Sequence, residues 1–344
     1  PPRVMQITGT PPQAVPLQAR SFPQAGANPL TASKVVSFGH YQPGRIVPNA
    51  ELETFVETSD EWITRRTGIK ERRWAGESDT VDSMAAEAGR MALANAGDLD
   101  ATQIDLVIVA TCTERDRSPN MAARVANALG MDQGPATIDV NTVCSGFCHA
   151  LALAQHAIAA GSATNALVIG SEKFTDATDF TDRTTCVLTA DGAGAMVVTA
   201  SAESGISPVL WGSVPSMSDA IRIEESNNGK FAQNGQSVYR WAVTQLPAIA
   251  AKVIERAGLD PEEIGAIVLH QANLRIIEPL AAQIGAPNAI VATDVVYSGN
   301  TSAASVPLAL SKMMADQPLP SGTPILLFAF GGGLSYAGQV ITAP

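Results

Sequence analysis

Residues 136–161 read ATIDVNTVCSGFCHALALAQHAIAAG, and this stretch decides the fold. Its first five residues, Ala136–Val140, predict a strand, the turn NTV follows, and a run of small and apolar residues predicts a helix. A second stretch, residues 292–314, has the same order and reads ATDVVYSGNTSAASVPLALSKMM. Here ATDVV predicts the strand, YSGN the turn and the remaining residues the helix. Two stretches with the same order of strand, turn and helix indicate an internal duplication.

The segments before these two stretches also correspond to each other. DLVIVAT, at residues 105–111, predicts a buried strand, and a helix is expected before it at residues 79–96. AIVLH, at residues 266–270, is the counterpart of that strand, and a helix is expected before it at residues 243–257. Strands that alternate with helices predict parallel sheets covered by helices.

A third pair of segments completes the repeat. ADGAGAMVVTA, at residues 190–200, is echoed by GGGLSYAGQVIT at residues 331–342. Three pairs in the same order support one interpretation better than any pair alone. We therefore expect an α/β fold built from two copies of one unit, with residues 32–204 in the first and residues 205–344 in the second.

The composition fits a packed globular enzyme. Of the 344 residues, 46% are hydrophobic, 16% are charged and 28 are glycine, which disfavours a disordered or coiled-coil protein. Residues 1–31 differ, because they are rich in Pro, Gln and Ala and have no hydrophobic periodicity. We expect a flexible extension there rather than a secretory signal. No run of about 18 apolar residues is present to span a bilayer.

The charge and the cysteines limit the possible partners. The chain carries 33 acidic and 22 basic side chains, a formal charge of −11. Such a field repels phosphates, so we expect no nucleic acid or membrane partner, and an anionic ligand needs a local basic patch. The four cysteines and four histidines are not spaced as metal ligands or as a disulfide framework. We expect no metal site and a cytoplasmic protein with reduced thiols.

Three side chains stand where chemistry is expected. Cys144 lies where a strand turns into a helix, and the helix N-terminus favours its thiolate, which predicts a lowered thiol pKa. His270 ends a strand, and Asn300 lies in the turn SGNTS. Each also has a plain structural interpretation: a buried cysteine, a hydrogen-bonded edge histidine and a turn asparagine. Their placement at strand ends in two related halves favours function.

Five motifs together resemble the β-ketoacyl-acyl-carrier-protein synthase III family of the thiolase superfamily. The resemblance extends from about Lys34 to Thr342, and its motifs occur in the family's order. It implies the duplicated five-layer αβαβα fold and a homodimer. The motifs are SDEWITRRTGIKERR (59–73), VNTVCSGF (140–147), LHQANLRI (269–276), GNTSAASVPLAL (299–310) and FGGGLSYAG (330–338).

The resemblance implies a Cys–His–Asn triad and a reaction in two halves. Cys144 attacks an acyl-CoA thioester to give an acyl-enzyme, while the backbone N–H groups of Cys144 and Gly332 hold the oxyanion. His270 and Asn300 then donate hydrogen bonds to the thioester carbonyl of malonyl-acyl carrier protein as CO2 leaves. The resulting carbanion attacks the acyl-enzyme and yields a β-ketoacyl product, which initiates fatty-acid or polyketide synthesis. No cofactor is implied.

The resemblance also assigns residues that bind coenzyme A. Trp62 and Arg183 resemble the pair that stacks on the adenine, and Arg66 is expected to meet the phosphates. Asn273 resembles the family's asparagine along the pantetheine tunnel.

Two further pairs face the carrier protein and the acyl chain. Arg240 and Arg275 match basic positions that receive the acidic carrier protein. Ser118 and Phe330 are assigned to the acyl pocket. The segment TERDRSPNM (113–121) is unusually charged where the family supplies a hydrophobic loop to the partner subunit's pocket, and Ser118 replaces a bulky aromatic residue. We therefore expect an open pocket that accepts a longer or polar acyl group.

Other functions remain open at this point. A relative that transfers the acyl group from CoA or carrier protein to an alcohol, an amine or another acceptor would share the nucleophile and the fold. A papain-like cysteine hydrolase has the same Cys–His–Asn order, but the flanking motifs and the duplication oppose it. A non-catalytic partner subunit would be expected to lack the nucleophile, whereas Cys144, His270 and Asn300 are all present.

Overall fold

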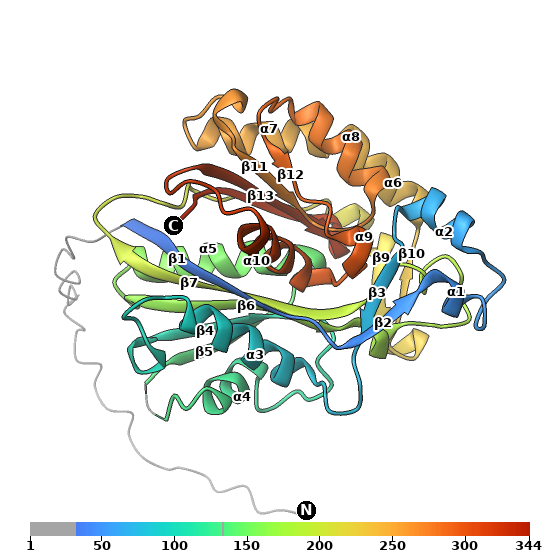
Figure 1. Ribbon diagram of the computed structural model, residues 1–344, viewed down its shortest axis with the longest axis horizontal. Coiled ribbons are helices and arrows are strands. Elements are labelled where there is room, and N and C mark those ends of the chain that lie inside the picture. The colour runs from blue at the N-terminus through green and yellow to red at the C-terminus, as the bar shows by residue number, and fades with distance from the viewer. Residues whose placement is uncertain (1–31, 133) are drawn as a thin grey trace, which may run out of the picture.

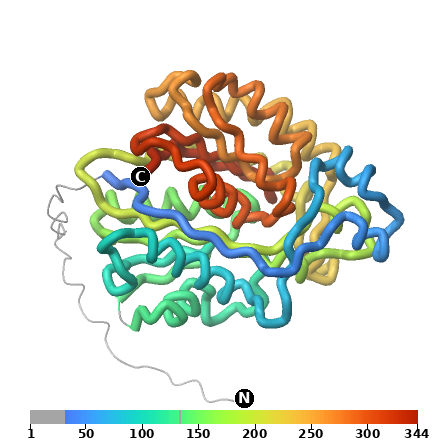
Figure 2. Tube along the Cα trace, in the orientation of Figure 1, coloured from blue at the N-terminus to red at the C-terminus, as the bar shows by residue number. Residues whose placement is uncertain are grey.

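The computed structural model describes residues 32–132 and 134–344. The predicted extension at residues 1–31 lies outside this part. Two five-stranded sheets are stacked with helices between them and on both outer faces (Figure 1). The trace in Figure 2 shows the two halves of the chain as two stacked units, with most of the blue to green part below the orange to red part.

The two sheets have the same strand order. The first runs β1-β7-β6-β4-β5, and the second, followed from its β8 edge, runs β8-β14-β13-β11-β12. In each, the strand in the middle pairs in parallel on one side and antiparallel on the other. The duplication is therefore confirmed at the level of topology. The strands of the first sheet are β1 (Ala32–Tyr41), β4 (Leu106–Ala110), β5 (Ala136–Val140), β6 (Asn165–Lys173) and β7 (Asp191–Ser201). Those of the second are β8 (Leu210–Gly212), β11 (Ala266–Leu269), β12 (Ile290–Val291), β13 (Pro324–Gly331) and β14 (Ser335–Thr342).

Helices form three layers around the sheets. Apolar side chains of α5 and α10 share one buried cluster with strands of both sheets, so these two helices make the central layer. The outer layers pack through two further clusters, giving the predicted five-layer αβαβα arrangement. The helices are α3 (Val81–Ala94) and α4 (Met121–Ala128) below, α5 (Gly146–Ala159) and α10 (Ser305–Asp316) in the centre, and α6 (Gly235–Thr244), α7 (Leu246–Arg256) and α8 (Leu274–Ile284) above.

Short elements at one end of the stack complete the described chain (Figure 1). Two two-stranded antiparallel sheets, β2–β3 and β9–β10, lie there beside three short helices. Their bounds are β2 (Arg45–Pro48), α1 (Asn49–Leu52), α2 (Asp60–Thr67), β3 (Glu71–Trp74), β9 (Ile221–Glu224), β10 (Lys230–Gln233) and α9 (Val295–Ser298).

The central layer approaches the first sheet closely because two positions on that sheet are glycine. A Cβ on Gly170 of β6 would lie 2.4 Å from the carbonyl oxygen of Ala303. A Cβ on Gly194 of β7 would lie 2.3 Å from the backbone nitrogen of Leu308. Real side chains cannot occupy such positions. The glycines therefore let the start of α10 press against the middle of the first sheet.

Two predicted elements are wrong in detail. The helix expected at residues 243–257 is two helices, since α6 ends at Thr244 and α7 begins at Leu246 with Pro247 in its first turn. ATDVV is not a strand, because β12 ends at Val291 and Val295 already begins α9. The backbone N–H of Val295 donates instead to the buried Gln271 side chain, at 3.0 Å.

Candidate active site

The loop that carries Cys144 has an unusual backbone. Cys144 lies in a 3-10 turn, Val143–Ser145, between β5 and α5, and its side chain is buried. Val143 has φ 49°, in the left-handed region that β-branched residues rarely adopt. The matching position in the second half, Ser302, has φ 50°. Both halves therefore use the same strained turn to enter their central helix.

A glycine loop presses directly on the nucleophile. A Cβ on Gly331, at the end of β13, would lie 2.6 Å from the Cβ of Cys144 and 2.9 Å from its backbone nitrogen. A Cβ on Gly332 would lie 2.7 Å from the Val143 side chain. Only a backbone without side chains can approach so closely. The Gly331–Gly332 backbone therefore borders the space above Cys144.

One cavity of about 1030 Å³ brings the three predicted catalytic residues together. Cys144 comes from the first half, and His270 and Asn300 come from the second, at the end of β11 and before α10. Phe330 and Gly331 complete this part of the wall. The structure therefore brings residues from both halves to one cavity.

His270 is neutral and has a defined tautomer. Burial lowers its pKa to about 3. Its Nδ1 lies 2.7 Å from the Ser305 hydroxyl oxygen, which also accepts the backbone N–H of Gln271 at 3.2 Å. Within the described part of the chain, Nδ1 is the one acceptor at hydrogen-bond distance from the Ser305 hydroxyl, so that hydroxyl donates to it. The ring proton then resides on Nε2.

The Asn300 amide is also oriented by a backbone group. Its Oδ1 accepts the N–H of Ser302 at 2.9 Å, and an N–H can only donate. The NH2 group is therefore the end that remains for the cavity. The backbone of Asn300 is held on both sides, since its N–H donates to Leu188 at 2.8 Å and its carbonyl accepts from Ala190 at 2.9 Å.

Cys144 differs from the sequence-based expectation in its ionisation. Burial raises the pKa of its thiol to about 12, although the Ser302 side chain and the backbone N–H of Cys144 lower it again. The predicted lowering at the helix N-terminus is therefore wrong in direction, because loss of water outweighs the local hydrogen bonds. The resting thiol is protonated at neutral pH.

The residues assigned to coenzyme A lie along the outer part of the cavity, with one exception. Trp62, Arg66 and Asn273 line it, and Asn273 Oδ1 is a buried acceptor without a hydrogen-bond partner in the described residues. Arg183 does not line it. Its guanidinium lies 4.6 Å from the Trp62 ring centre and donates to the Glu57 carbonyl at 2.8 Å. An adenine base stacked between the Arg183 guanidinium and the Trp62 ring needs a separation of roughly 7 Å, twice a contact distance. Arg183 must therefore move to admit the base.

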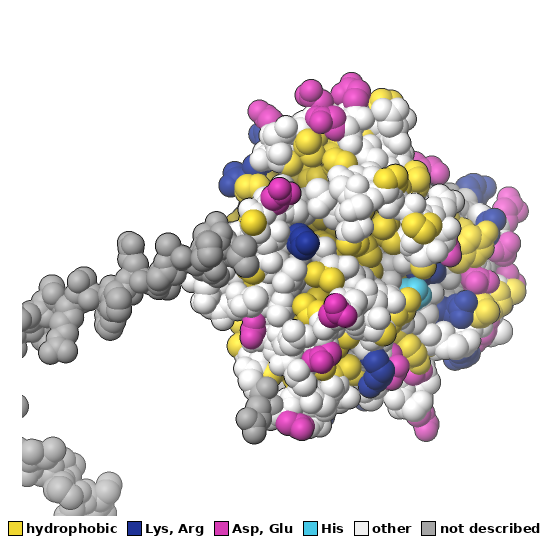
Figure 3. Space-filling view, turned by 60° about the vertical axis from the view of Figure 1, so that its left-hand side comes forward, with side chains coloured by type: hydrophobic (Ala, Val, Ile, Leu, Met, Phe, Trp, Pro, Cys, Tyr) yellow, Lys and Arg dark blue, Asp and Glu magenta, His cyan; other side chains and the backbone are white. Residues whose placement is uncertain are grey.

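Basic side chains surround the outer opening. A shallow hollow of about 400 Å³ there is lined by Trp62, Arg65, Arg66 and Arg275. Arg275 is exposed on α8 and lies 5.6 Å from the Tyr239 ring, and Arg240 is exposed beside Tyr239 on α6. On the face shown in Figure 3, by contrast, acidic side chains gather at the upper end.

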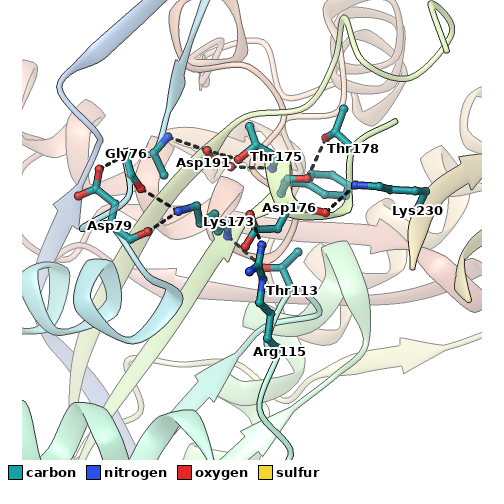
Figure 4. A network of polar contacts seen from close by, with 12 residues as sticks. Gly76, Asp79, Thr113, Arg115, Lys173, Thr175, Asp176, Thr178, Asp191 and Lys230 are labelled. Carbon is teal, nitrogen blue, oxygen red and sulfur yellow. Dashed lines mark hydrogen bonds and ion pairs between the residues drawn. The ribbon is translucent and has the colours of Figure 1, made fainter. Parts of the chain in front are cut away.

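The two residues assigned to the acyl pocket are not brought together. Phe330 lines the cavity, with its ring 5.4 Å from that of His270. Ser118 is exposed and does not reach the cavity of its own chain. Its segment is tied to its own chain by Arg115, which pairs with Asp176 at 2.8 Å (Figure 4). The assignment of Ser118 to a partner's pocket stays a prediction.

Sequence reasoning missed three residues behind the cavity wall. Ser305 sets the His270 tautomer, Ser302 orients Asn300, and the buried Glu172 contacts Ser302. The one available signal for Glu172 is a charged residue at the end of the apolar segment ALVIGSE. The two serines lie within the motif around Asn300, but no pattern separates them from ordinary turn residues.

A duplicated five-layer fold that directs a cysteine, a histidine and an asparagine into one cavity defines a thiolase-like condensing enzyme. The comparisons with known proteins agree. The family model of 3-oxoacyl-[acyl-carrier-protein (ACP)] synthase III matches residues 138–215, and that of its C-terminal part matches residues 254–343.

Similar chains carry the same family's name. β-Ketoacyl-[acyl-carrier-protein] synthase III 2 of Streptomyces avermitilis is 60% identical over 318 residues, which cover 92% of this chain and all of that one. The synthase III of Mycobacteroides abscessus is 44% identical, covering 90% and 94%. The chain therefore belongs to the β-ketoacyl-acyl-carrier-protein synthase III family and is an acyltransferase-type enzyme.

Solved structures agree with this assignment. The priming β-ketosynthase of a polyketide pathway superimposes with a TM-score of 0.88 at 38% identity, covering 91% of this chain and 96% of the other. The synthase III of Aquifex aeolicus gives 0.85 at 38% identity, covering 90% and 100%. The family assignment by sequence motifs is confirmed. In the described residues, every helix is too short or too polar to span a membrane.

Proposed function

We propose that this protein condenses an acyl-CoA primer with malonyl-acyl carrier protein through an acyl-Cys144 intermediate, with loss of CO2. The observation that carries the proposal is the convergence of Cys144, His270 and Asn300, from two halves of the chain, on one cavity. The names of the similar synthases and of the priming ketosynthase support it. The reaction starts a fatty-acid or polyketide chain.

In the first half-reaction, Cys144 Sγ attacks the thioester carbonyl of the primer. The new S–C bond forms, the bond to CoA sulfur breaks, and the thiol proton ends on the departing CoA thiol. Because the resting thiol is protonated, proton removal accompanies the attack. The oxyanion is held by the backbone N–H groups of Cys144 and Gly332, a role supported by the close approach of the glycine loop.

In the second half-reaction, two neutral donors face the malonyl thioester. The Nε2–H of His270 and the NH2 of Asn300 hydrogen-bond its carbonyl oxygen, on which negative charge grows as CO2 leaves. Such donors stabilise the transition state more than the ground state. The enolate carbon then attacks the acyl-Cys144 carbonyl, and the Cys144 thiolate leaves and takes up a proton.

The path from the surface to Cys144 suits a pantetheine arm. Asn273 Oδ1, which lacks a partner in the described residues, accepts an N–H of a pantetheine amide. Trp62 and Arg66 meet the nucleotide end of CoA, with Arg183 moving away from Trp62 to let the adenine stack. Arg240 and Arg275 at the opening receive the acidic carrier protein. This chemistry needs no metal or other cofactor.

A homodimer is part of the proposal. Strand β5 is one of the two edge strands of the first sheet, and its Ile138 is 43% exposed. An edge strand with a free ladder and an exposed apolar side chain is suited to pair with a second copy. Cysteines 112, 144, 148 and 186 are all free, which agrees with the proposed cytoplasmic location.

Intact-protein mass spectrometry tests the reaction. The enzyme is incubated with acyl-CoAs from acetyl to medium-chain length and then with malonyl-acyl carrier protein. A mass gain on Cys144 that is discharged as a β-ketoacyl product supports the proposal. A gain released only to an alcohol or amine identifies an acyltransferase without condensation. A strong preference for acetyl-CoA contradicts the open pocket expected from Ser118.

A further inference from the structure

Glu172 is a buried carboxylate that the two half-reactions do not use. It lies near the end of β6, in the middle of the first sheet, and its side chain has no solvent exposure. No lysine or arginine forms an ion pair with it in the described residues. A buried charge without a cation is costly unless hydrogen bonds compensate it. The hydrogen bonds to Glu172 therefore show which segments it holds in place.

The carboxylate joins the two halves of the molecule. Oε2 accepts hydrogen bonds from the hydroxyls of Thr111 at 3.0 Å and Thr113 at 2.6 Å, just after β4. Oε1 accepts from the Ser302 hydroxyl at 3.0 Å and from the Ala303 N–H at 3.4 Å, in the other half. The Cys112 N–H donates to both oxygens, at 3.1 and 3.2 Å.

These contacts make both oxygens of Glu172 hydrogen-bond acceptors. Backbone N–H groups cannot accept, so neither oxygen can carry a proton toward Cys112 or Ala303. Burial raises the pKa of Glu172, and the hydrogen bonds from Thr113, Cys112 and Ser302 lower it. The Cys112 thiol also donates, to Oε1 at 3.2 Å, which extends the same acceptor role.

The segment held by Glu172 is the one that orients Asn300. Ser302 has φ 50°, a conformation that a non-glycine residue keeps only when its neighbours impose it. Its hydroxyl is tied to Glu172, and its N–H holds Asn300 Oδ1 at 2.9 Å. Ala303 is fixed from the other side by its contact with Gly170. A continuous set of contacts thus runs from Glu172 through Ser302 to the Asn300 amide.

We infer that Glu172 is a positioning residue for the condensation half-reaction. It holds the Ser302–Ala303 turn so that the Asn300 NH2 faces the malonyl thioester, and it touches no substrate atom. The inference rests on the proposed role of Asn300 in decarboxylation. Acylation of Cys144 does not need Asn300, so the two half-reactions separate this role from general support of the fold.

Glu172→Gln is the first test. The amide NH2 of glutamine cannot accept a hydrogen bond, so either the two threonine hydroxyls or the Ser302–Ala303 turn loses its acceptor and the network must rearrange. We expect malonyl decarboxylation to fall roughly 10- to 100-fold, the effect of a small misplacement of a reacting group. Acylation of Cys144 by acyl-CoA is expected to persist, because the negative charge of Glu172 raises the pKa of that thiol. Equal loss of both half-reactions in a folded variant overturns the inference.

A double variant separates positioning from general destabilisation. Once Asn300→Ala removes the amide, Glu172→Gln has no Asn300 donor left to misplace, and we expect no additional loss of decarboxylation. Additive losses contradict the inference. The proposed function fails separately, since an Asn300→Ala enzyme that decarboxylates normally removes the role of Asn300 whatever Glu172 does.

Two further variants guard against misfolding. Ser302→Ala deletes one donor to Glu172 and keeps both backbone N–H groups, so a smaller loss of decarboxylation is expected, together with slower acylation because the Ser302 side chain lowers the Cys144 pKa. Asp191→Asn is the matched control, because Asp191 is equally buried and accepts from the N–H of Ala75 and Thr175 (Figure 4) but not from Ser302 or Ala303. Asp191→Asn is expected to lower the melting temperature without selective loss of decarboxylation. A selective loss of decarboxylation in Asp191→Asn, or normal decarboxylation in Ser302→Ala, counts against the role inferred for Glu172.

Discussion

At the scale of single residues, Cys144 and Asn300 serve different half-reactions. Cys144→Ala removes the sulfur that carries the acyl group, so no acyl-enzyme should form. Asn300→Ala leaves that sulfur in place but deletes a donor to the developing enolate, and it should reduce decarboxylation by about 10²- to 10³-fold. Intact mass after acyl-CoA treatment and release of labelled CO2 measure the two steps. If Asn300→Ala blocks acylation as strongly as decarboxylation, this division is wrong.

The burial of His270 predicts a pH dependence of stability. Its folded pKa is about 3, below the usual 6.5, so the unfolded chain binds this proton first. The contribution of neutral His270 to the free energy of unfolding is therefore fully present above pH 6.5 and is lost as the pH decreases toward 3. His270→Gln removes this loss, so the stability of wild type relative to the variant should decrease by roughly 2 kcal/mol between pH 6.5 and 5. Urea unfolding at both values measures it, and a constant difference would contradict a neutral, buried imidazole.

At the scale of elements, hydrophobic periodicity predicted the helices and strands that depend on contacts local in sequence. Strand β5 was placed at its observed bounds, and the grouping of Cys144, His270 and Asn300 was expected from the family resemblance. The strand expected at ATDVV failed because Gln271, distant in sequence, takes the N–H of Val295. Glu172 was missed for the same reason, since its partners come from other strands and from the second half. Local patterns do not carry such contacts.

The glycine loop gives a prediction for an element. Gly331→Ala introduces a Cβ 2.6 Å from that of Cys144, so β13 or the Cys144 turn must shift. We expect a destabilisation of about 1–3 kcal/mol and slower acylation by acyl-CoA. Gly44→Ala is the control, because nothing lies within 4 Å of its added Cβ. Thermal unfolding and the acylation rate measure both effects; a normal rate in Gly331→Ala would show that the loop does not constrain Cys144.

At the scale of the whole molecule, charge decides where an acidic partner docks. The chain carries −11 overall, yet Arg65, Arg66 and Arg275 surround the opening of the cavity. Arg275→Glu should lower kcat/KM for malonyl-acyl carrier protein by about tenfold at low salt, with less effect as salt screens the contact. Acylation by acyl-CoA should change less. Arg256→Glu, on α7, makes the same change in net charge away from the opening, and an equal loss there would point to overall charge instead of docking.

Strands β5 and β12 lie at corresponding edges of the two sheets, and they differ in length. Strand β5 has five residues with Ile138 exposed, whereas its counterpart β12 has two residues with Ile290 exposed. A ladder of two residues contributes little pairing, so a second copy should dock on β5. Ile138→Lys should therefore shift the protein from dimer to monomer, while Ile290→Lys should leave it dimeric. Sedimentation velocity at micromolar concentration measures this. If Ile290→Lys dissociates the protein and Ile138→Lys does not, the dimer forms through the second sheet. Pairing at β5 would then not bring residues 113–121 to the acyl pocket of the partner subunit.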